Sequence, residues 1–385
     1  MPCLNERDSL PGCIEEAQTF LRESAVDGEV LIADNNSSDG SQELARKLGA
    51  RVVEVSVAGY GAALYAGTCA SRGRYIIMGD ADGSYDFSSL MPFLAKLREG
   101  FDLVVGNRFA GGIQPGAMPW KNRYLGNPIL SGIGRLFFRP NIRDFHCGIR
   151  GISREAFDSL DLRTTGMEYA SEMVISATIK RLRVAEVPTS LRQDSRSRRP
   201  HLRPWRDGWR HLRFMLLYSP EWLFMVPGLA CMITGLIVGA RLWFGPWSVA
   251  GITFDFHTLV FAALATLLGF QVLAFGVSSK IFAIREGLLP ESPRLNMLFK
   301  HITLEIGLLI GLLCVVLGLS GIIPSLLSWY ETGFGDLIIN QMLRTVIVAA
   351  TVTVLGLQII FTSFFLSILG LKFHPKGVGE FREYS

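Results

Sequence analysis

Residues Glu29–Leu48 read EVLIADNNSSDGSQELARKL, and this stretch decides the fold of the amino-terminal half. Its apolar run, Glu29–Asp34, is typical of a buried strand, and the polar turn after it leads into an amphipathic helix over Gly40–Leu48. The same alternation continues along the chain, with strands predicted at Arg51–Val55, Arg74–Gly79 and Asp102–Gly106 and helices predicted at Gly61–Ser71 and Phe87–Arg98. Strands alternating with helices favour a Rossmann-like α/β fold with a mainly parallel sheet covered on both faces.

Long apolar runs dominate the carboxyl-terminal half. Four of them contain no Asp, Glu, Lys or Arg, namely Trp222–Ala240, Phe256–Ser279, Ile306–Tyr330 and Thr345–Leu371. Each approaches or exceeds the roughly 20 residues that a helix needs to cross a bilayer. Helices of a soluble bundle normally keep a charged face, so we predict four membrane-spanning helices. The chain then divides into an α/β domain over 1–190, a basic interface segment over 191–220 and a transmembrane region over 221–385.

Lys and Arg residues occur in every second connection between these spans. Lys280, Arg285, Arg294 and Lys300 lie between the second and third spans, and Lys372, Lys376 and Arg382 follow the fourth. The connections Gly245–Asp255 and Glu331–Met342 contain no Lys or Arg. Because cytoplasmic loops carry the excess of positive charge, we expect the α/β domain and the carboxyl terminus to be cytoplasmic.

Charge and cysteine usage exclude several classes of protein. The net charge of +4 is too small to indicate nucleic-acid binding. The six cysteines form no C-x-x-C pair and no Cys/His cluster, which argues against a zinc site and against a disulfide framework. We expect free thiols in a domain that faces a reducing compartment.

Polar clusters lie where ligands bind in open α/β sheets, at the carboxyl ends of strands. They are Pro2–Glu6 (PCLNE), Asp34–Ser41 (DNNSSDGS) and Asp80–Gly83 (DADG). Ser38 or Asp39 is a plausible N-cap, but capping does not explain Asp34, whose carboxylate is able to accept hydrogen bonds from a base or ribose. Asp80 and Asp82 are spaced to hold a divalent cation such as Mg²⁺, which takes one or two carboxylates and completes its shell with phosphate oxygens.

A glycine-rich stretch, Gly59-Tyr60-Gly61-Ala62-Ala63, follows a predicted strand and opens a predicted helix. The position that a dinucleotide-binding fingerprint reserves for its third glycine or alanine holds Leu64. The fingerprint therefore fails, and a dehydrogenase is set aside.

Together these clusters resemble family 2 glycosyltransferases with the GT-A fold. Within that family the chain is similar to the polyisoprenyl-phosphate branch, the dolichol-phosphate mannose or glucose synthase type. Further matching residues are Gly106–Arg108 (GNR), Asp144–Arg150 (DFHCGIR), Glu172, Glu186–Pro188 and Arg192–Arg199. The resemblance covers nearly the whole amino-terminal half in the right order, and the four-span tail resembles multi-span members of the branch.

The resemblance implies roles for individual residues. It assigns nucleotide binding to Pro2, Leu4, Asn5, Glu6 and Asp34, and it assigns the donor diphosphate and the metal, Mg²⁺ or Mn²⁺, to Asp80 and Asp82. We add Asp39 and Gly61 to the expected donor-binding residues, and we expect Asp80, Asp82 and Arg108 to be catalytic. There are two departures from the family pattern. Asn35 stands where the family often has a second aspartate, and the apolar strand that should precede P-x-L-N-E is reduced to Met1. We therefore expect an in-frame apolar segment upstream of Met1.

The segment between the two halves is rich in arginine. Eight arginines lie between Arg192 and Arg213 against two acids, and Trp205 and Trp209 interleave with them at helical spacing. Because the segment directly precedes the first span, we expect it to bind anionic headgroups with its tryptophans at the interface. Arginine binds phosphate by paired hydrogen bonds, and we assign Arg192 and Arg198 to the phosphate of the acceptor lipid.

The sequence therefore predicts metal-dependent, inverting transfer of a hexose from a donor of the UDP-glucose or GDP-mannose class to a polyisoprenyl phosphate. We expect an integral protein of the bacterial inner membrane that binds no nucleic acid, and a homo-oligomer is left open. One alternative is a processive polysaccharide synthase, although its Q-x-x-R-W motif does not occur. Another is a non-catalytic membrane scaffold with a degenerate transferase domain, which the intact D-A-D and the retained arginines argue against.

Overall fold

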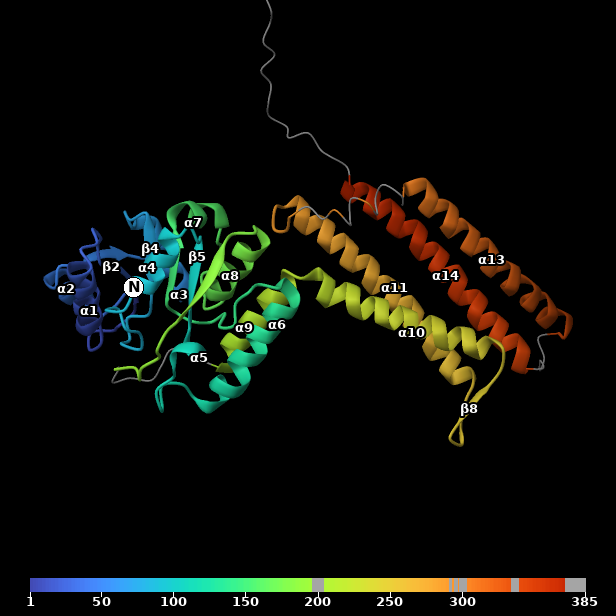
Figure 1. Ribbon diagram of the computed structural model, residues 1–385. Coiled ribbons are helices and arrows are strands. Elements are labelled where there is room, and N and C mark those ends of the chain that lie inside the picture. Colours follow the sequence, from blue (N-terminus) through green and yellow to red (C-terminus); the bar gives the residue numbers. More distant parts are fainter. Residues whose placement is uncertain (196–203, 291–292, 294–296, 298–302, 334–338, 371–385) are drawn as a thin grey trace, which may run out of the picture. The chain divides into compact units, whose positions relative to one another are not determined.

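The computed structural model describes residues 1–195, 204–290, 293, 297, 303–333 and 339–370 (Figure 1). The chain divides into two compact units, Met1–Ser219 and Pro220–Ser385. The described part of the basic segment, including helix α9 (Pro204–Leu217), belongs to the first unit.

The first unit is an α/β domain with two sheets. Strands β1 (Pro2–Cys3), β2 (Leu31–Asp34) and β3 (Arg51–Glu54) form a parallel sheet in the order β1-β2-β3. The second sheet has the order β4-β6-β5-β7, from β4 (Tyr75–Met78), β5 (Leu103–Asn107), β6 (Arg150–Ser153) and β7 (Val184–Pro188). Strand β6 runs antiparallel to both neighbours, whereas β5 and β7 are parallel. The expected fold class, a mainly parallel α/β domain, is confirmed.

Helices connect and cover these strands: α1 (Leu10–Glu23), α2 (Ser41–Lys47), α3 (Tyr60–Ala70), α4 (Met91–Arg98), α5 (Arg108–Gly111), η1 (Asn122–Gly126), α6 (Asn127–Phe138), α7 (Arg154–Leu160) and α8 (Tyr169–Ile179). The predicted start of α4 at Phe87 is wrong by four residues. Ser88 donates from its backbone N–H and its hydroxyl to Asp86 Oδ1, and this turn delays the helix.

The core of the first unit is built on β5 and the strands beside it. Leu103, Val104 and Val105 are fully buried, as expected for a strand covered on both faces. Phe145 and Ile152 join the same cluster, so the segment leading into β6 is held by the core.

Strand β1 has only two residues. Met1 donates from its amino group to Leu31 O, and its carbonyl accepts from Ala33 N–H, so β1 pairs with β2. Among the described strands no ladder joins β1 to β4. A cavity of about 400 Å³ lies there, lined by apolar side chains that include Leu31, Ile76 and Phe87. The expectation of an apolar segment upstream of Met1 stays a prediction.

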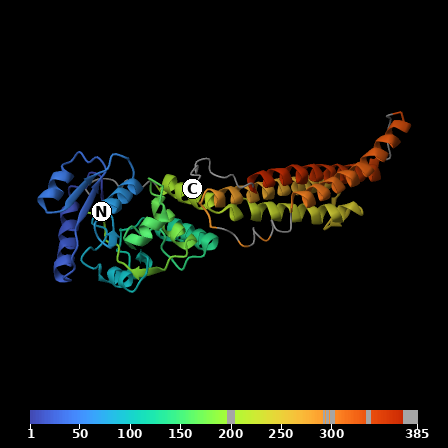
Figure 2. The ribbon, with the colours of Figure 1, turned by 90° about the horizontal axis from the view of Figure 1, so that it is seen from above.

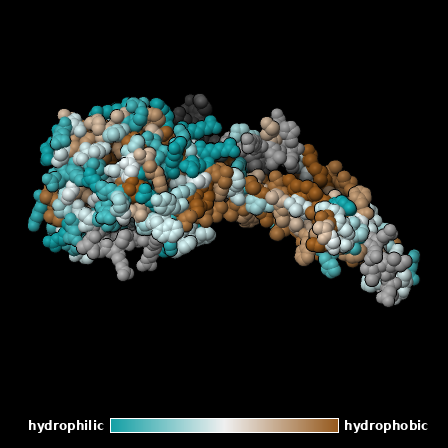
Figure 3. Space-filling model, turned by 60° about the horizontal axis from the view of Figure 1, so that its bottom comes forward, coloured by the Kyte–Doolittle hydropathy of each residue, from teal (hydrophilic) through white to brown (hydrophobic). Residues whose placement is uncertain are grey.

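The second unit contains the four predicted apolar helices. They are α10 (Val226–Trp243), preceded by the π-helical turn η2 (Glu221–Met225), then α11 (Phe256–Arg285), α13 (Leu304–Glu331) and α14 (Ile339–Gly370). Each is long and apolar enough to cross a membrane, which confirms four candidate spans. Figure 2 shows these helices running side by side, and Figure 3 shows their brown, hydrophobic surface. A hairpin that the sequence analysis did not predict, β8 (Trp247–Val249) and β9 (Ile252–Phe254), connects α10 to α11.

Glycines bring these helices close together. A side-chain carbon added at Gly235 would lie 2.5 Å from Thr266 Oγ1, and one at Gly318 would lie 2.7 Å from Ala349 O. Small residues at such crossings are typical of membrane helices, where packing replaces the hydrophobic driving force.

Candidate active site

The first two polar clusters form one hydrogen-bonded surface. Asn5 adopts a left-handed backbone with φ of 56°, and its Oδ1 accepts from Ser38 N–H at 2.8 Å. Asp39 accepts from Arg7 N–H at 3.0 Å and from both the N–H and the hydroxyl of Ser41. Burial acts to raise the pKa of Asp39, but these hydrogen bonds dominate and lower it. The loops after β1 and β2 are therefore fixed to one another.

Asp34 ends β2 and is buried. Its Oδ2 accepts from Ser37 N–H at 2.9 Å and from Gln42 Nε2 at 2.7 Å, whereas its buried Oδ1 has no hydrogen-bond partner among the described residues. A buried carboxylate oxygen without a partner is costly, so this atom suits a ligand donor.

Asn35, the departure from the family pattern, ties two loops together. Its Nδ2 donates to Val55 O at 3.0 Å and to Val57 O at 2.7 Å, and its Oδ1 accepts from Gly59 N–H at 2.7 Å. An ionised aspartate could not make the two donations, which explains why the amide serves here.

The D-A-D turn follows β4. Asp80 Oδ1 accepts from the hydroxyl of Tyr60 at 2.8 Å. Burial, followed by the nearby Asp80 charge, holds the pKa of Tyr60 well above its usual value, so its hydroxyl stays a proton donor. Asp82 Oδ1 accepts from both the N–H and the hydroxyl of Ser84. The two carboxylates are thus oriented by neighbouring donors.

After β7, residues 191–195 pass over the D-A-D turn. Ser195 N–H donates to Asp82 O at 3.0 Å, and Arg192 N–H donates to Ser84 O at 2.9 Å. The Arg192 guanidinium forms ion pairs with Glu16 and Asp86, both at 2.7 Å. Residues 191–195 therefore lie against the D-A-D turn, and a phosphate at Arg192 would have to compete with two carboxylates.

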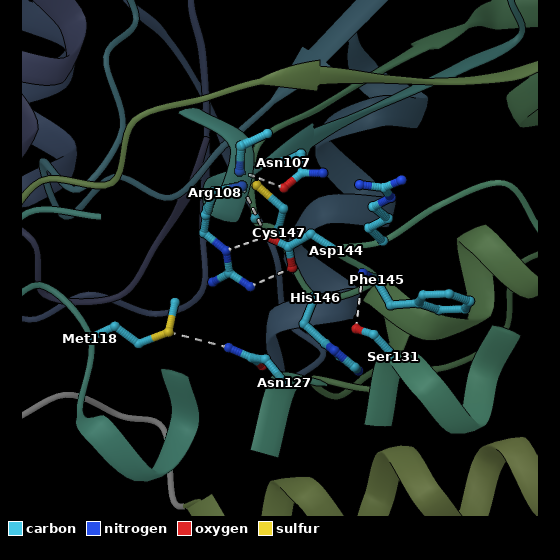
Figure 4. Close-up of polar contacts among 12 residues, drawn as sticks. Asn107, Arg108, Met118, Asn127, Ser131, Asp144, Phe145, His146 and Cys147 are labelled. Atoms are coloured by element: carbon cyan, nitrogen blue, oxygen red, sulfur yellow. Dashed lines mark hydrogen bonds and ion pairs between the residues drawn. The ribbon is translucent and has the colours of Figure 1, made fainter. Parts of the chain in front are cut away.

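A buried ion pair joins Arg108 to Asp144 (Figure 4). Arg108 donates from Nε and Nη2 to the two oxygens of Asp144 at 2.8 and 2.7 Å. Burial opposes the charge on Arg108, but the negative surroundings, Asp144 included, keep the pKa of its guanidinium well above the usual value. Glu186 Oε1 accepts from Asp144 N–H at 2.9 Å, and its Oε2 accepts from Asn107 Nδ2 at 3.1 Å. Glu186 thus connects β7 to Asn107, at the end of β5, and to Asp144.

The D-F-H-C-G-I-R loop is fixed by its own arginine. Arg150 donates to Cys147 O at 2.8 Å, to Phe145 O at 2.6 Å and to Ala170 O. A side-chain carbon at Gly148 would lie 2.3 Å from Asp80 Oδ2, so only glycine lets the loop approach the D-A-D turn this closely. The Asp144–Arg150 loop, whose Asp144 pairs with Arg108, therefore lies against the D-A-D turn that carries Asp80 and Asp82.

Comparisons with known proteins identify the family of the chain. Residues 1–161 match the description "Glycosyl transferase family 2", and residues 277–370 match "Glycosyltransferase family 2 C-terminal transmembrane region". The chain is 37% identical over 375 residues to the low-salt glycan biosynthesis hexosyltransferase Agl6 of Haloferax volcanii, covering 96% of this chain and 88% of that protein. The chain belongs to glycosyltransferase family 2. It is a membrane-embedded glycosyltransferase.

Two further proteins are similar to a smaller part of this chain. A dolichyl-phosphate hexose transferase of Haloferax volcanii is 31% identical over 166 residues, which cover 43% of this chain and 70% of that protein. A solved glucosyl-3-phosphoglycerate synthase from Mycobacterium tuberculosis in complex with Mn²⁺, uridine diphosphate and glucosyl-3-phosphoglycerate has a TM-score of 0.44. It is 21% identical and covers 56% of this chain and 76% of that one.

The remaining assigned residues of this family 2 chain lie in different settings. Pro2, Leu4 and Glu6 lie in or directly after β1, and Glu6 N–H donates to Ser41 Oγ at 3.1 Å. A side-chain carbon at Gly61 would lie 2.6 Å from Thr164 O, so packing alone already requires glycine there. Arg198 lies outside the described residues. The roles of all these residues stay predictions.

The described residues hold no group of three or more His, Cys, Asp and Glu side chains that could bind a metal ion. Asp80 and Asp82 still fit a hard divalent cation by donor chemistry, because such ions take few protein ligands when substrate phosphates complete the shell. All six cysteines are free. Burial raises the pKa of Cys3 to about 11 and that of Cys13 to about 12, so these thiols are inert.

Sequence reasoning missed several residues that shape the site. Tyr60 was considered only within a dinucleotide fingerprint, although its place at the start of α3 could have indicated a contact with the neighbouring strand end. Ser9, whose hydroxyl donates to Ala81 O at 2.7 Å, gave no signal. Neither did Ser171, whose hydroxyl lies 3.3 Å from His146 Nε2 and 2.8 Å from His211 Nδ1.

Proposed function

We propose that this glycosyltransferase moves a hexose from a nucleotide-sugar to the phosphate of a polyisoprenyl lipid. The observation that carries the proposal is the interlocking of the D-A-D turn with the Asp144–Arg150 loop and with residues 191–195. The D-A-D turn carries carboxylates suited to a donor diphosphate, and it lies against the loop whose Asp144 pairs with Arg108. The chain then leads into the membrane spans. The names of the relatives, a hexosyltransferase and a dolichyl-phosphate hexose transferase, support this choice of sugar and acceptor.

The donor would lie across the loops after β1 and β2. We assign Asp34 Oδ1 to a hydrogen-bond donor on the base or ribose, because this oxygen is buried and has no partner among the described residues. Asn5, Glu6 and Asp39 would shape the rest of the nucleotide pocket. UDP-glucose and GDP-mannose remain the leading donors.

In the reaction, an oxygen of the lipid phosphate attacks the anomeric carbon. The bond from that carbon to the donor diphosphate breaks, and its electron pair leaves with the nucleoside diphosphate. A phosphate monoester loses its second proton near pH 6, so the acceptor is already an anion and needs no strong general base. The family resemblance implies inversion of configuration.

The chain's own contribution is to align two anions. Asp80 and Asp82 would hold Mg²⁺ or Mn²⁺, which would supply positive charge to the leaving diphosphate. We assign Arg108 to the reacting phosphates, since Asp144 fixes its guanidinium through Nε and Nη2 and leaves Nη1 without a hydrogen bond to the described residues. Arg192 and Arg198 remain assigned to the acceptor phosphate.

We further propose that the first unit faces the cytoplasm, from the distribution of Lys and Arg between the spans. Arg344, near the predicted outer end of α14, pairs with Asp255, and this pairing offsets the positive charge of Arg344. An inner membrane of bacteria stays a prediction.

The test is to incubate membranes containing the protein with labelled UDP-glucose or GDP-mannose, with and without added polyprenyl phosphate. We expect label in the lipid fraction only when both substrates are present. Transfer that does not depend on polyprenyl phosphate, or transfer that extends a polymer, would favour a polysaccharide synthase. Donor binding without any transfer would favour a scaffold.

A further inference from the structure

Two glutamines lie in the middle of the apolar helices. Within residues 226–240, 258–279, 306–330 and 345–370, which form the interior of the four candidate spans, Gln271 and Gln358 are the only residues of type Asp, Glu, Asn, Gln, His, Lys or Arg. Gln271 is 15 residues from the first residue of α11 and 14 from the last, and Gln358 is 16 residues after the start of the fourth candidate span and 12 before its end. Both amides therefore lie near the middle of the hydrocarbon layer, where an unpaired polar group is costly and commonly has a function.

The two amides meet but do not satisfy each other. Gln358 Nε2 donates to Gln271 Oε1 at 3.2 Å, which joins α14 to α11. Two amides together offer four N–H groups and two oxygens, so a single bond leaves most of them unused. Among the described residues, Gln358 Oε1 is buried without a hydrogen-bond partner and Gln271 Nε2 donates to no acceptor. The pair is therefore incomplete within one chain.

Gln271 lies in the exposed stripe of α11. Helices α10 and α14 both pack against α11 and cover its other sides (Figure 1). From residue 261 to residue 282 the exposed positions follow one another at steps of 3, 4, 3, 4 and 7, and they are Phe261, Leu264, Leu268, Gln271, Phe275 and Phe282. The five apolar side chains among them are 54% to 70% exposed.

This spacing is that of a heptad seam, the repeat by which two helices pack along their length. A straight helix drifts by about 20° per heptad relative to such a repeat, so a stripe that keeps the repeat from residue 261 to residue 282 suits a helix that coils around α11. Gln271 occupies a seam position between Leu268 and Phe275. In coiled coils, one polar residue at a seam position fixes the register and the number of helices.

We propose that a second copy of this chain docks on this stripe, with α11 against α11 and the two Gln271 amides hydrogen-bonded to each other. Copies with the same membrane topology are related by a two-fold axis normal to the membrane, so the two helices run parallel and equal positions meet. Gln271 Nε2 of each copy then donates to Gln271 Oε1 of the other, which keeps a second lone pair after accepting from Gln358. The contact supplies hydrogen-bond partners that lipid tails lack.

Self-complementarity favours a second copy over a different protein as the occupant. An amide carries both a donor and an acceptor, so the same residue at the same depth of a second copy completes it. A different membrane protein would need its own polar group at this depth and apolar side chains that fit the same seam. The inference needs only that the chain spans a membrane, and it does not rest on the proposed reaction.

The test is disulfide cross-linking of the full chain in liposomes over a series of protein-to-lipid ratios. The background carries Cys69→Ser, Cys231→Ala and Cys314→Ala, which remove the thiols that are not buried. Leu268→Cys places a thiol in the seam, and Leu309→Cys on α13, at a position that is 72% exposed, is the matched control. Copper phenanthroline oxidises the thiols, and the yield of cross-linked dimer is read from a non-reducing gel.

We expect Leu268→Cys to cross-link at lipid dilutions where Leu309→Cys no longer does. Adding Gln271→Leu, at a position that faces away from the chain's own core, should weaken association roughly tenfold or more, seen as a shift in the protein-to-lipid ratio at half-maximal yield. Adding Gln358→Leu instead removes the bond within one chain and should leave the yield unchanged.

Three outcomes would overturn the proposal. Equal yields at positions 268 and 309 would mean that copies meet only by collision. Cross-linking at 268 that survives Gln271→Leu would mean that the amide takes no part in the contact. Equal losses with Gln271→Leu and Gln358→Leu would mean that the amide pair serves only to hold α11 against α14 within one chain.

Discussion

The two units of this chain bury different kinds of atoms. The first unit buries charged side chains such as Arg108 and Asp144 and satisfies them through directed hydrogen bonds. The described helices of the second unit are instead brought together by glycines, at contacts such as Gly235 on Thr266. Chemistry therefore depends on charge placement in the first unit, whereas anchoring depends on close packing in the second. Substitutions in the two units should therefore impair different properties, namely the reaction in the first unit and helix packing in the second.

The largest effect is expected at the D-A-D turn. Asp82→Asn removes a charge but keeps the shape and the contact with Ser84, so the protein should stay folded and lose transfer by roughly 10²–10³-fold or more. Asp158→Asn, the same change at an exposed position of α7, is the control. Transfer by the Asp82 variant at the wild-type rate, with metal still required, would show that Asp82 is misassigned.

The next largest effect is on the stability of the first unit. Asp144→Asn leaves the buried Arg108 without its counter-ion, and breaking such a pair costs about 3–5 kcal/mol. The control is Asp161→Asn, because Asp161 pairs with Arg163 where both side chains are at least 60% exposed and solvent screens the pair, so its loss should change stability little. Thermal unfolding followed by protease resistance would separate the two. Equal losses would mean that the Arg108–Asp144 pair is not the buried, unscreened contact described above.

A third prediction concerns the stability of the first unit at acidic pH. Burial lowers the pKa of His211 to about 4 and that of His146 well below its usual value, so both are neutral in the folded state. The unfolded chain protonates them near pH 6.5 and therefore binds more protons between pH 6.5 and 4. Stability should be complete above pH 6.5 and fall toward pH 4, by about 3 kcal/mol for His211 alone.

The variant His211→Gln keeps a hydrogen-bonding group near Ser171 but does not titrate. Its stability should fall less than that of the wild type between pH 6.5 and 4.5, and because both proteins share the same carboxylates, the difference between them reports His211. Stability is measured by unfolding at each pH. If the stability of the variant falls with pH as steeply as that of the wild type, His211 does not cause the loss of stability in acid.

The smallest predicted effect belongs to the second unit. A side-chain carbon at Gly269 would lie 2.4 Å from Met232 N, so Gly269→Ala must separate α10 from α11 and should cost about 1–3 kcal/mol. At Gly239, in the same helix pair, the nearest atom is Ala262 Cβ at 3.9 Å, and Gly239→Ala should be neutral. Donor binding should survive both changes. Loss of donor binding in the Gly269 variant alone would contradict the division of roles between the units.

The sequence predicted those parts of the fold that periodicity controls. The strands at Leu31–Asp34 and Leu103–Asn107 and the four apolar helices were found because burial on both faces, or in lipid, leaves a continuous apolar run. Strand β6 was not recognised as a strand, because its sequence RGIS begins with a charged residue, Arg150, which is buried and donates to backbone carbonyls.

The site was predictable where a residue type has a local reason. Asp34, Asp80 and Asp82 stand at strand ends, where carboxylates have little structural purpose. The roles of Tyr60, Ser9 and Ser171 depend on contacts between residues far apart in the chain, such as Ser9 with Ala81, and no local pattern indicates such contacts.

The central claim is tested most directly by the mass of the lipid product. Purified protein in liposomes is given one nucleotide-sugar, polyprenyl phosphate and Mg²⁺ or Mn²⁺, and the extracted lipid is analysed by mass spectrometry. The account predicts a polyprenyl phosphate that carries a single hexose, formed by the wild type and not by the Asp82→Asn variant. A lipid that carries several hexoses, or an unmodified lipid although the donor binds, would contradict it.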